Sequence, residues 1–240
     1  MCNMEKRAVL LAGGKGTRLK PYTLMLPKPL VPIGNMPIIE IVIKQLINNG
    51  FTHITIAINH MAEMIKEFCG DGSRWGTKID YSLENKPLST MGPLKLIKDL
   101  PDNFLVMNGD ILTNLNYADL FDFHIANNNI FTISAHKRDH KVDYGVLETN
   151  NVNQLDSFKE KPLLHYKVSM GIYMVSKICL DIIPENTFYG FDNLMLDLIS
   201  QNRPASVKVF DGYWLDIGRP SDYEKACRDF EQGEIEILLK

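Results

Sequence analysis

The sequence lacks the features by which several broad classes of protein are recognised. Its formal net charge is only −3, so no excess of basic side chains indicates binding to nucleic acid or to a membrane surface. No apolar run approaches the roughly 18–20 residues that a membrane-spanning helix needs. Its four cysteines form no C-x-x-C pair, which favours reduced thiols over a disulfide framework. We therefore expect a soluble cytoplasmic protein with no nucleic-acid or membrane partner.

Two familiar phosphate-binding motifs are also missing, although one segment is built from the same residue types. LAGGKGTRLKPYTLMLPKPL, residues 11–30, combines three glycines with lysines and an arginine. It lacks the G-x-x-x-x-G-K-[ST] spacing of a P-loop, and Leu19 stands where the G-x-G-x-x-G fingerprint needs its third glycine. The glycines directly follow an apolar strand, where backbone N–H groups can approach an oxyanion. We expect a phosphate-binding loop from Gly13 to about Met36.

Short apolar runs alternate with amphipathic segments along the first half of the chain. Strands are predicted at 7–12, 53–59, 78–83 and 103–108, and helices at 37–50, 61–69, 92–100 and 117–128. This order is typical of parallel strands joined by helical crossovers, with ligands bound beyond the carboxyl ends of the strands. The second half is less regular, with strands at 130–136, 144–149, 155–162, 166–176 and 206–211, a helix at 193–202 and a closing helix at 221–232 capped by Ser221. We expect one α/β domain over residues 1–240.

Two aspartates follow apolar strands at positions that suit a cation. Asp110 ends VMNGD, and Asp216 lies in YWLDIG. Two carboxylates at strand ends near a phosphate loop favour a hard divalent cation such as Mg²⁺, held between protein and phosphates. Either aspartate alone is equally well explained as a turn former or a helix cap.

Glu84, in the run YSLENKPLSTMG, suggests how a base would be recognised. A carboxylate offers only acceptors, so the base must present donors. Guanine does so with its N1–H and amine, and cytosine with its amino group. A solvated charge at the end of a strand is the alternative for Glu84.

Two further pairs of residues are less specific. Glu160 and Lys161 in FKEKP could bind sugar hydroxyls and a phosphate, although such a pair is usually a surface charge pair. His136 and His140 have the i, i+4 spacing of a helical zinc site, but no third ligand is evident and a polar loop is expected there.

Taken together, these segments resemble the sugar-1-phosphate nucleotidyltransferases, or nucleotide-sugar pyrophosphorylases. LAGGKGTRLKPYT, LPKPLVPIGNMPII, PLSTMGPL, VMNGD, FKEKP, SMGIY and YWLDIGRPSDY follow in the order of that family. The resemblance is closest to mannose-1-phosphate and heptose-1-phosphate guanylyltransferases. It implies a Rossmann-like, mostly parallel sheet flanked by helices, the glycosyltransferase-A-like nucleotidyltransferase fold, without the β-helix tail of many relatives. A nucleotide-binding half, about 1–110, and a sugar-phosphate-binding half, about 111–240, are expected.

The resemblance also implies a reaction and its residues. A nucleotidyl group passes from an NTP, with GTP favoured, to a sugar 1-phosphate, giving NDP-sugar and pyrophosphate for the synthesis of bacterial-type surface glycan precursors. Arg18, Lys28 and Asp110 are the expected catalytic residues, and Asp110 and Asp216 the Mg²⁺ ligands. The expected nucleotide-binding residues are Leu11, Ala12, Gly13, Gly14, Gly16, Thr17, Arg18, Glu84, Gly92, Asn108 and Asp110. Those expected around the sugar phosphate are Gly145, Glu160, Lys161, Ser169 and Gly171. A homo-oligomer is left open.

Four residues depart from the family pattern and leave the acceptor sugar open. Ser89 stands where glycine is usual and Met91 where a small residue is usual, while Ser169 and Met170 replace an N-A pair. A cytidylyltransferase acting on a sugar phosphate or a choline-type phosphate is the alternative enzyme. A catalytically silent nucleotide-sugar sensor or regulatory subunit is the alternative of another class. It predicts loss of a cationic residue or a metal ligand, yet all are present.

Overall fold

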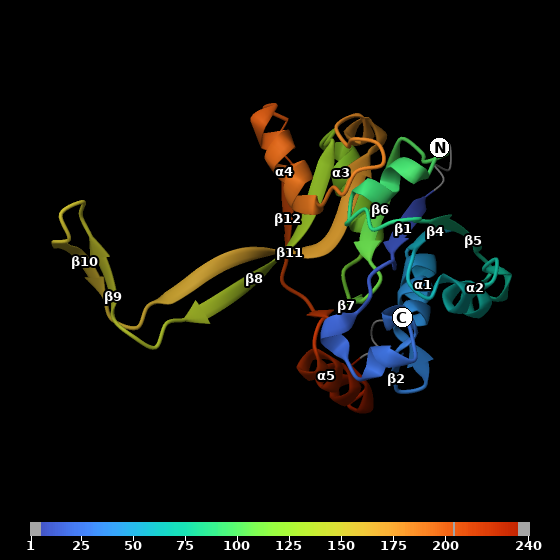
Figure 1. Cartoon of the computed structure of the whole chain (residues 1–240), viewed down its shortest axis with the longest axis horizontal. Helices are drawn as coiled ribbons and strands as arrows, with labels where there is room; N and C mark the ends of the chain where they lie inside the picture. The colour runs from blue at the N-terminus through green and yellow to red at the C-terminus, as the bar shows by residue number, and fades with distance from the viewer. Residues whose placement is uncertain (1–5, 204, 235–240) are drawn as a thin grey trace.

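A seven-stranded sheet forms the centre of the molecule in the computed structural model, which describes residues 6–203 and 205–234 (Figure 1). The strand order is β12-β8-β11-β6-β1-β4-β5. β6 (Asn103–Asn108), β1 (Arg7–Leu11), β4 (His53–Ile58) and β5 (Lys78–Leu83) are parallel. β11 (Leu163–Ser176) runs antiparallel between β6 and β8 (Phe131–Lys141), and β12 (Ser206–Phe210) is parallel to β8. The predicted mostly parallel sheet is confirmed.

Helices cover both faces of this sheet because successive side chains of each strand point to opposite sides. Ala8 and Leu10 pack into one apolar cluster with α1 (Ile38–Asn48), α2 (Ala62–Cys69), α3 (Tyr117–Ala126) and α5 (Pro220–Glu231). Val9 faces a second cluster, which includes residues of α4 (Phe191–Ser200) and of the 3₁₀ turn Lys177–Asp181. The result is a helix–sheet–helix sandwich with its core on both sides of β1.

Short elements beyond the carboxyl ends of the strands shape the ligand side. β7 (Ile111–Thr113) follows β6 at once and pairs with β13 (Trp214–Asp216). The long loop after β1 is folded into the 3₁₀ turns Thr17–Leu19, Tyr22–Leu24 and Lys28–Leu30, and it then pairs β2 (Pro32–Ile33) with β3 (Met36–Pro37). The four prolines of this loop prevent a long helix but permit such turns.

Three local predictions were wrong. The segment 92–100 is a 3₁₀ turn over Gly92–Leu96, in which the Leu94 N–H donates to the Met91 carbonyl and the Ile97 N–H to the Leu94 carbonyl, and the N–H of Gly92 donates to the Tyr189 carbonyl. Helix α5 begins at Pro220 after an Arg219 cap, so Ser221 lies inside its first turn. His136 lies in β8, as the strand predicted at 130–136 implies, but β8 continues to Lys141, so His140 lies in this strand and not in a loop.

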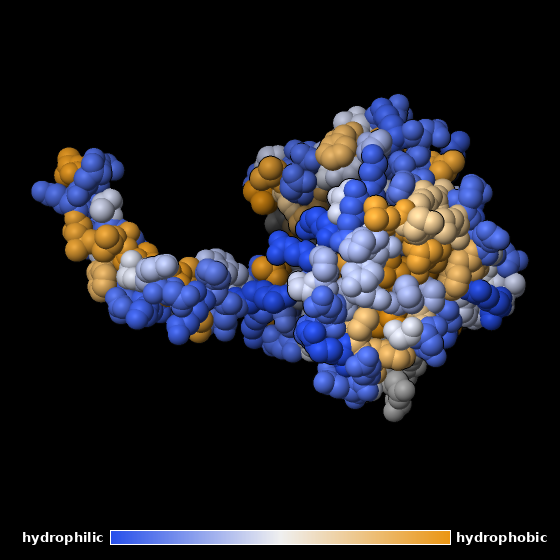
Figure 2. Space-filling view, turned by 60° about the horizontal axis from the view of Figure 1, so that its bottom comes forward, coloured by the Kyte–Doolittle hydropathy of each residue, from blue (hydrophilic) through white to orange (hydrophobic). Residues whose placement is uncertain are grey.

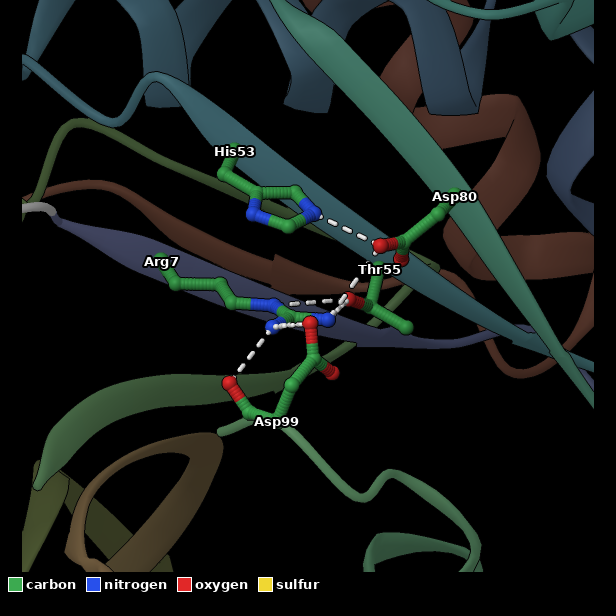
Figure 3. A network of polar contacts seen from close by, with 5 residues as sticks. All are labelled: Arg7, His53, Thr55, Asp80 and Asp99. Atoms are coloured by element: carbon green, nitrogen blue, oxygen red, sulfur yellow. Dashed lines mark hydrogen bonds and ion pairs between the residues drawn. The ribbon is translucent and has the colours of Figure 1, made fainter. Parts of the chain in front are cut away.

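Buried polar side chains join the amino ends of the parallel strands. The Arg7 guanidinium donates to Thr55 Oγ1 at 2.7 and 2.9 Å, to Asp80 Oδ2 at 3.2 Å and to the Asp99 carbonyl at 3.0 Å (Figure 3). His53 Nε2 lies 2.6 Å from the same Asp80 oxygen. Because Arg7 is 97% shielded from solvent but fully bonded, this network holds β1, β4 and β5 together at the end opposite the loop.

A long two-stranded ribbon leaves the body of the protein. From Lys137 onward β8 is exposed, and it pairs with the exposed first half of β11. At the far end the chain forms a bent hairpin of β9 (Val146–Thr149) and β10 (Leu155–Lys159), well separated from the sheet (Figure 1). Residues 137–167 are called the arm below.

No helix in the described part of the chain is long and apolar enough to cross a membrane. The three cysteines described, Cys69, Cys179 and Cys227, are free thiols.

Candidate active site

The carboxyl ends of the parallel strands enclose a cavity of about 320 Å³. Its lining residues are Leu11, Gly13, Gly14, Asn59, Glu84, Pro87, Leu88, Ser89, Thr90, Asn108, Asp110 and Phe188. Six of these were predicted to bind nucleotide. Asn59 was missed, although it directly follows β4 and so has the strand-end position that revealed Asp110. Phe188 enters from a distant loop, and no local pattern marks it.

Glu84 forms part of the floor of this cavity. The residue is only 8% exposed, and its Oε2 accepts from the Leu88 N–H at 3.1 Å. A Cβ at Gly13 would lie 2.7 Å from Oε1, so any larger residue there would have to displace this carboxylate. Burial raises the pKa of Glu84, an effect that the Leu88 N–H partly opposes. Glu84 is therefore a buried acceptor facing the cavity rather than a solvated charge.

Charged side chains gather beside the same cavity. Lys28, from the 3₁₀ turn of the loop, forms an ion pair with Asp110 Oδ2. Pairing of β13 with β7 brings Asp216 opposite Ile111, next to Asp110. A Cβ at Gly218 would lie 3.7 Å from Arg18 Nη2 and 3.8 Å from Asp216 Oδ1. The fold thus brings together two cations and two carboxylates that are far apart in sequence.

Asp216 lies at the rim of this cluster, where part of its side chain is exposed. Partial burial of its carboxyl group raises its pKa, the charge of Asp110 raises it further, and Lys28 and Arg18 lower it. Two carboxylates that repel in this way are stabilised by a cation placed between them.

The charged cluster also fits a divalent metal ion that is shared with a substrate. Asp110 Oδ1 is buried and has no hydrogen-bond partner in the described structure, so one oxygen is free to coordinate. Within residues 6–203 and 205–234, no group of three or more histidine, cysteine or acidic side chains could hold a metal by itself. Two protein carboxylates with substrate oxygens and water suit Mg²⁺, which seldom occupies an all-protein cage.

The remaining predicted nucleotide residues lie around this cluster. Ala12, Gly14 and Lys28 line a smaller cavity of about 50 Å³ beside Asp110. Gly16 and Thr17 lie at the start of the first 3₁₀ turn. Gly92 lines neither cavity, and a Cβ there would lie 2.7 Å from the Thr187 carbonyl oxygen, so it supports the loop that carries Phe188.

The predicted sugar-phosphate residues separate into two groups. Ser169 and Gly171 lie at the base of the arm, where a Cβ at Gly171 would be 2.7 Å from Asn108 Nδ2. Gly145, Glu160 and Lys161 lie together in the distant hairpin of the arm, with Lys161 Nζ 3.7 Å from Glu160 Oε1. Figure 1 shows this hairpin far from the carboxyl ends of the strands. Within one chain, only the first group is next to the cavity.

The residues that depart from the family pattern lie in different surroundings. Ser89 lines the cavity with φ +66°, a conformation that glycine adopts without strain. Met91 and Met170 are buried, and the Met170 carbonyl accepts from Trp214 Nε1 at 3.1 Å.

The sequence matches the nucleotidyl transferase family over residues 7–233. The chain belongs to this family. A mannose-1-phosphate guanyltransferase of Saccharomyces cerevisiae is 34% identical over 90% of this chain and 62% of its own length, and the beta-A protein of Xenopus laevis has the same values. The chain therefore spans less than two thirds of these relatives.

Solved structures of the family also resemble the chain closely. HddC from Yersinia pseudotuberculosis superposes with a TM-score of 0.72 at 29% identity, over 93% of this chain and 99% of that chain. HddC complexed with GMP-PN gives a TM-score of 0.70 at 28% identity, with the same coverage. The predicted family and fold are thus confirmed.

Proposed function

We propose that this family member transfers a nucleotidyl group from an NTP, with GTP favoured, to a sugar 1-phosphate and releases pyrophosphate. The observation that carries the proposal is the cluster of Lys28, Arg18, Asp110 and Asp216 beside a cavity whose floor holds the Glu84 carboxylate. The guanyltransferase names of its relatives and the GMP-PN complex of HddC support it. The product would serve the synthesis of glycan precursors in the cytoplasm.

The chemistry needs charge neutralisation and alignment more than proton transfer. The attacking oxygen of a sugar 1-phosphate is already anionic, so no histidine base is required. Lys28 and Arg18 would neutralise the negative charge that develops on the phosphates and on the departing pyrophosphate. Asp110 and Asp216 would hold Mg²⁺, which would supply further positive charge at the same place. The loop that begins at Gly13 positions the triphosphate through its backbone N–H groups.

The proposed division of labour follows the two halves of the chain. All but one of the residues lining the cavity lie between Leu11 and Asp110, which supports a nucleotide-binding half at about 1–110. The exception is Phe188. Ser169, Gly171 and the arm lie in the half at about 111–240 that we assign to the sugar phosphate.

A substrate panel tests this function. The purified protein is incubated with Mg²⁺, one of GTP, CTP, UTP or dTTP, and one of a set of sugar 1-phosphates, while pyrophosphate release is measured. We expect release with GTP and at least one sugar 1-phosphate. A preference for CTP would favour the cytidylyltransferase alternative, since Glu84 can also accept from the cytosine amine. Nucleotide binding without release under any condition would favour the silent sensor.

A further inference from the structure

The arm presents an apolar surface that no part of its own chain covers. Its exposed large apolar side chains are Tyr144, Leu147, Val152, Leu155, Phe158, Leu163 and Tyr166. Figure 2 shows hydrophobic side chains along the hairpin, which stands clear of the body. A two-stranded hairpin alone is marginally stable in water at best, so these side chains need a surface to pack on.

The apolar face of the hairpin is also the face that carries Glu160. Phe158 pairs directly with Leu147, which places both side chains on one side. A Cβ at Gly145 would lie 2.6 Å from the Phe158 ring and 3.3 Å from Glu160 Oε2, so the carboxylate shares that side. The opposite face is polar and self-satisfied, because Ser157 Oγ donates to Glu148 at 2.7 Å and Lys159 pairs with it at 3.2 Å. Whatever covers the apolar face therefore also receives Glu160.

The ribbon of β8 and β11 carries the hairpin well away from the body of its own chain (Figure 1). Pairing of β8 with β11 runs without a register shift from Leu163↔Lys141 to Ser169↔Ala135, and its irregularity lies only between Ser169 and Tyr173. At the other end of the ribbon, next to the Leu163↔Lys141 pair, the Val142 N–H donates to the Pro162 carbonyl at 3.0 Å. Within the described ranges, the hydrogen bonds and ion pairs of residues 142–161 join them only to other residues of the arm.

We propose that two copies of the chain form a twofold dimer in which each arm crosses to the other copy and completes its sugar-phosphate site. The proposal rests on the proposed function, which requires Glu160 and Lys161 beside Asn108 and Gly171. A second copy offers Asn108 and Gly171 together with an exposed apolar side chain beside them, since Phe188 lines the cavity and is 68% exposed. Exchange of identical arms gives two equivalent interfaces and closes the assembly.

In this dimer, the two residues of the arm take defined roles in the other copy. The Glu160 carboxylate accepts hydrogen bonds from hydroxyls of the sugar, and the Lys161 ammonium pairs with its phosphate. The nucleotide is held by one chain and the sugar phosphate by both.

Mixed dimers provide the decisive experiment. Asp110→Asn damages the pocket and leaves the arm intact, while Glu160→Gln damages the arm and leaves the pocket intact. The two variants are co-expressed with different affinity tags, and the mixed dimer is isolated through both tags. Arm exchange gives one fully intact site and one doubly damaged site, so we expect about half of the wild-type kcat, with each parent dimer at least about tenfold lower.

A mixed dimer of Glu160→Gln with Lys161→Ala is the matched control. Every site then receives a damaged arm, so its activity should stay as low as that of its parents. If the pocket–arm mixed dimer is equally inactive, each site uses the arm of its own chain and the proposal is overturned.

The mass in solution tests the exchange independently of activity. Light scattering should give about twice the chain mass of 27.3 kDa for the wild type, and one chain mass for Phe158→Asp on the apolar face. Ser157→Ala, on the polar face of the same hairpin, should remain dimeric. A monomeric wild type, or a dimer that Phe158→Asp leaves intact, overturns the proposal. A dimer that depends on Phe158 but releases no pyrophosphate with any substrate contradicts the proposed function alone.

Discussion

The two carboxylate oxygens of Asp110 have different surroundings: Oδ2 pairs with Lys28, while Oδ1 has no described hydrogen-bond partner. Asp110→Asn removes the charge without changing the size of the side chain. We expect kcat to fall by on the order of 10² at saturating Mg²⁺, since a principal electrostatic group of the reaction is lost. Asp102 is an exposed carboxylate just before β6, the strand that Asp110 follows. Asp102→Asn is therefore the control and should leave kcat unchanged. Wild-type turnover by Asp110→Asn would remove this residue from the reaction.

Glu84 should select the base through its inability to donate a hydrogen bond. Glu84→Gln places an amide donor in the cavity and leaves polar groups mismatched, at a cost of roughly 1–3 kcal/mol. The variant should lose its preference for GTP and improve relative to wild type on UTP or dTTP, whose edges mix donors and acceptors. Measurements of kcat/KM for four NTPs in both proteins provide the check. An unchanged ranking means that Glu84 does not read the base.

Ser89 adopts a left-handed conformation in the turn that borders the cavity. A non-glycine residue there is strained by roughly 1–2 kcal/mol, part of which glycine gives back through the entropy of the unfolded chain. Ser89→Gly should therefore raise the free energy of unfolding by about 0.5–1 kcal/mol in urea titrations. Ser89→Ala retains the strain and should not stabilise the fold. A loss of stability in the glycine variant would mean that the serine hydroxyl compensates for the strain.

At the scale of the elements, His124 fastens helix α3 to three strands. It is fully buried, with Nδ1 2.8 Å from Thr132 of β8 and Nε2 3.0 Å from Ser176 of β11 and 3.1 Å from Asn103 of β6. Burial lowers its pKa from 6.5 to about 4, so the folded protein holds the neutral ring. The unfolded chain then binds more protons between those values, and stability should fall as the pH drops from about 6.5 to about 4.

The size of that fall is testable. The shift in the pKa of His124 corresponds to about 3 kcal/mol in the free energy of unfolding. This contribution is fully present above pH 6.5 and is lost by pH 4. Urea titrations at several pH values should show this loss in the wild type and a flatter profile in His124→Asn, whatever the overall stability of the variant. Equal pH dependence in both proteins would assign the acid sensitivity to other groups.

The elements that could be predicted are those whose own residues carry the signal. The four buried parallel strands are apolar runs with clear ends, and the prediction for 103–108 matches β6. Lys137–Lys141 gave no strand signal, because its polar residues are extended only through pairing with the first half of β11, which lies far along the chain. The failed helix at 92–100 shows that apolar residues at helical spacing can also form a 3₁₀ turn, here one whose Gly92 N–H is bonded to the carbonyl of Tyr189 in a distant segment.

The candidate site shows the same limit. Asp110 and Glu84 could be found because a residue that follows a parallel strand lies on the ligand side of the sheet. Asp216 was found from the short apolar run before it, although its strand β13 is antiparallel to β7. The closeness of Lys28 to Asp110 depends on how a loop of prolines folds, and the entry of Phe188 depends on a distant segment. Neither contact leaves a local pattern. The position of Glu160 on an arm is likewise a property of long-range strand pairing.

At the scale of the whole molecule, the half of the chain that we propose binds the nucleotide should not fold alone. A fragment ending at Asp110 contains all four parallel strands but leaves the edge of β6 open, since β11 is its missing neighbour. In the complete sheet, Phe104, Leu105, Val106 and Met107 are fully buried. We expect this fragment to aggregate, and the full chain to remain in the supernatant after the same expression and centrifugation. A soluble fragment with cooperative urea unfolding would contradict this.

The strand order also bears on how the protein is made. A ribosome delivers β1, β4, β5 and β6 first, and it must then complete α3, β8 and the whole arm before β11 can join β6. Throughout that interval the nascent chain displays an apolar strand with unpaired N–H and C=O groups along one side. Chaperones that bind extended apolar segments would meet this chain at β6, and pauses in translation between residues 108 and 176 would lengthen the exposure. Pairing of β11 with β6 therefore ends the period of synthesis in which the edge of β6 is exposed to aggregation.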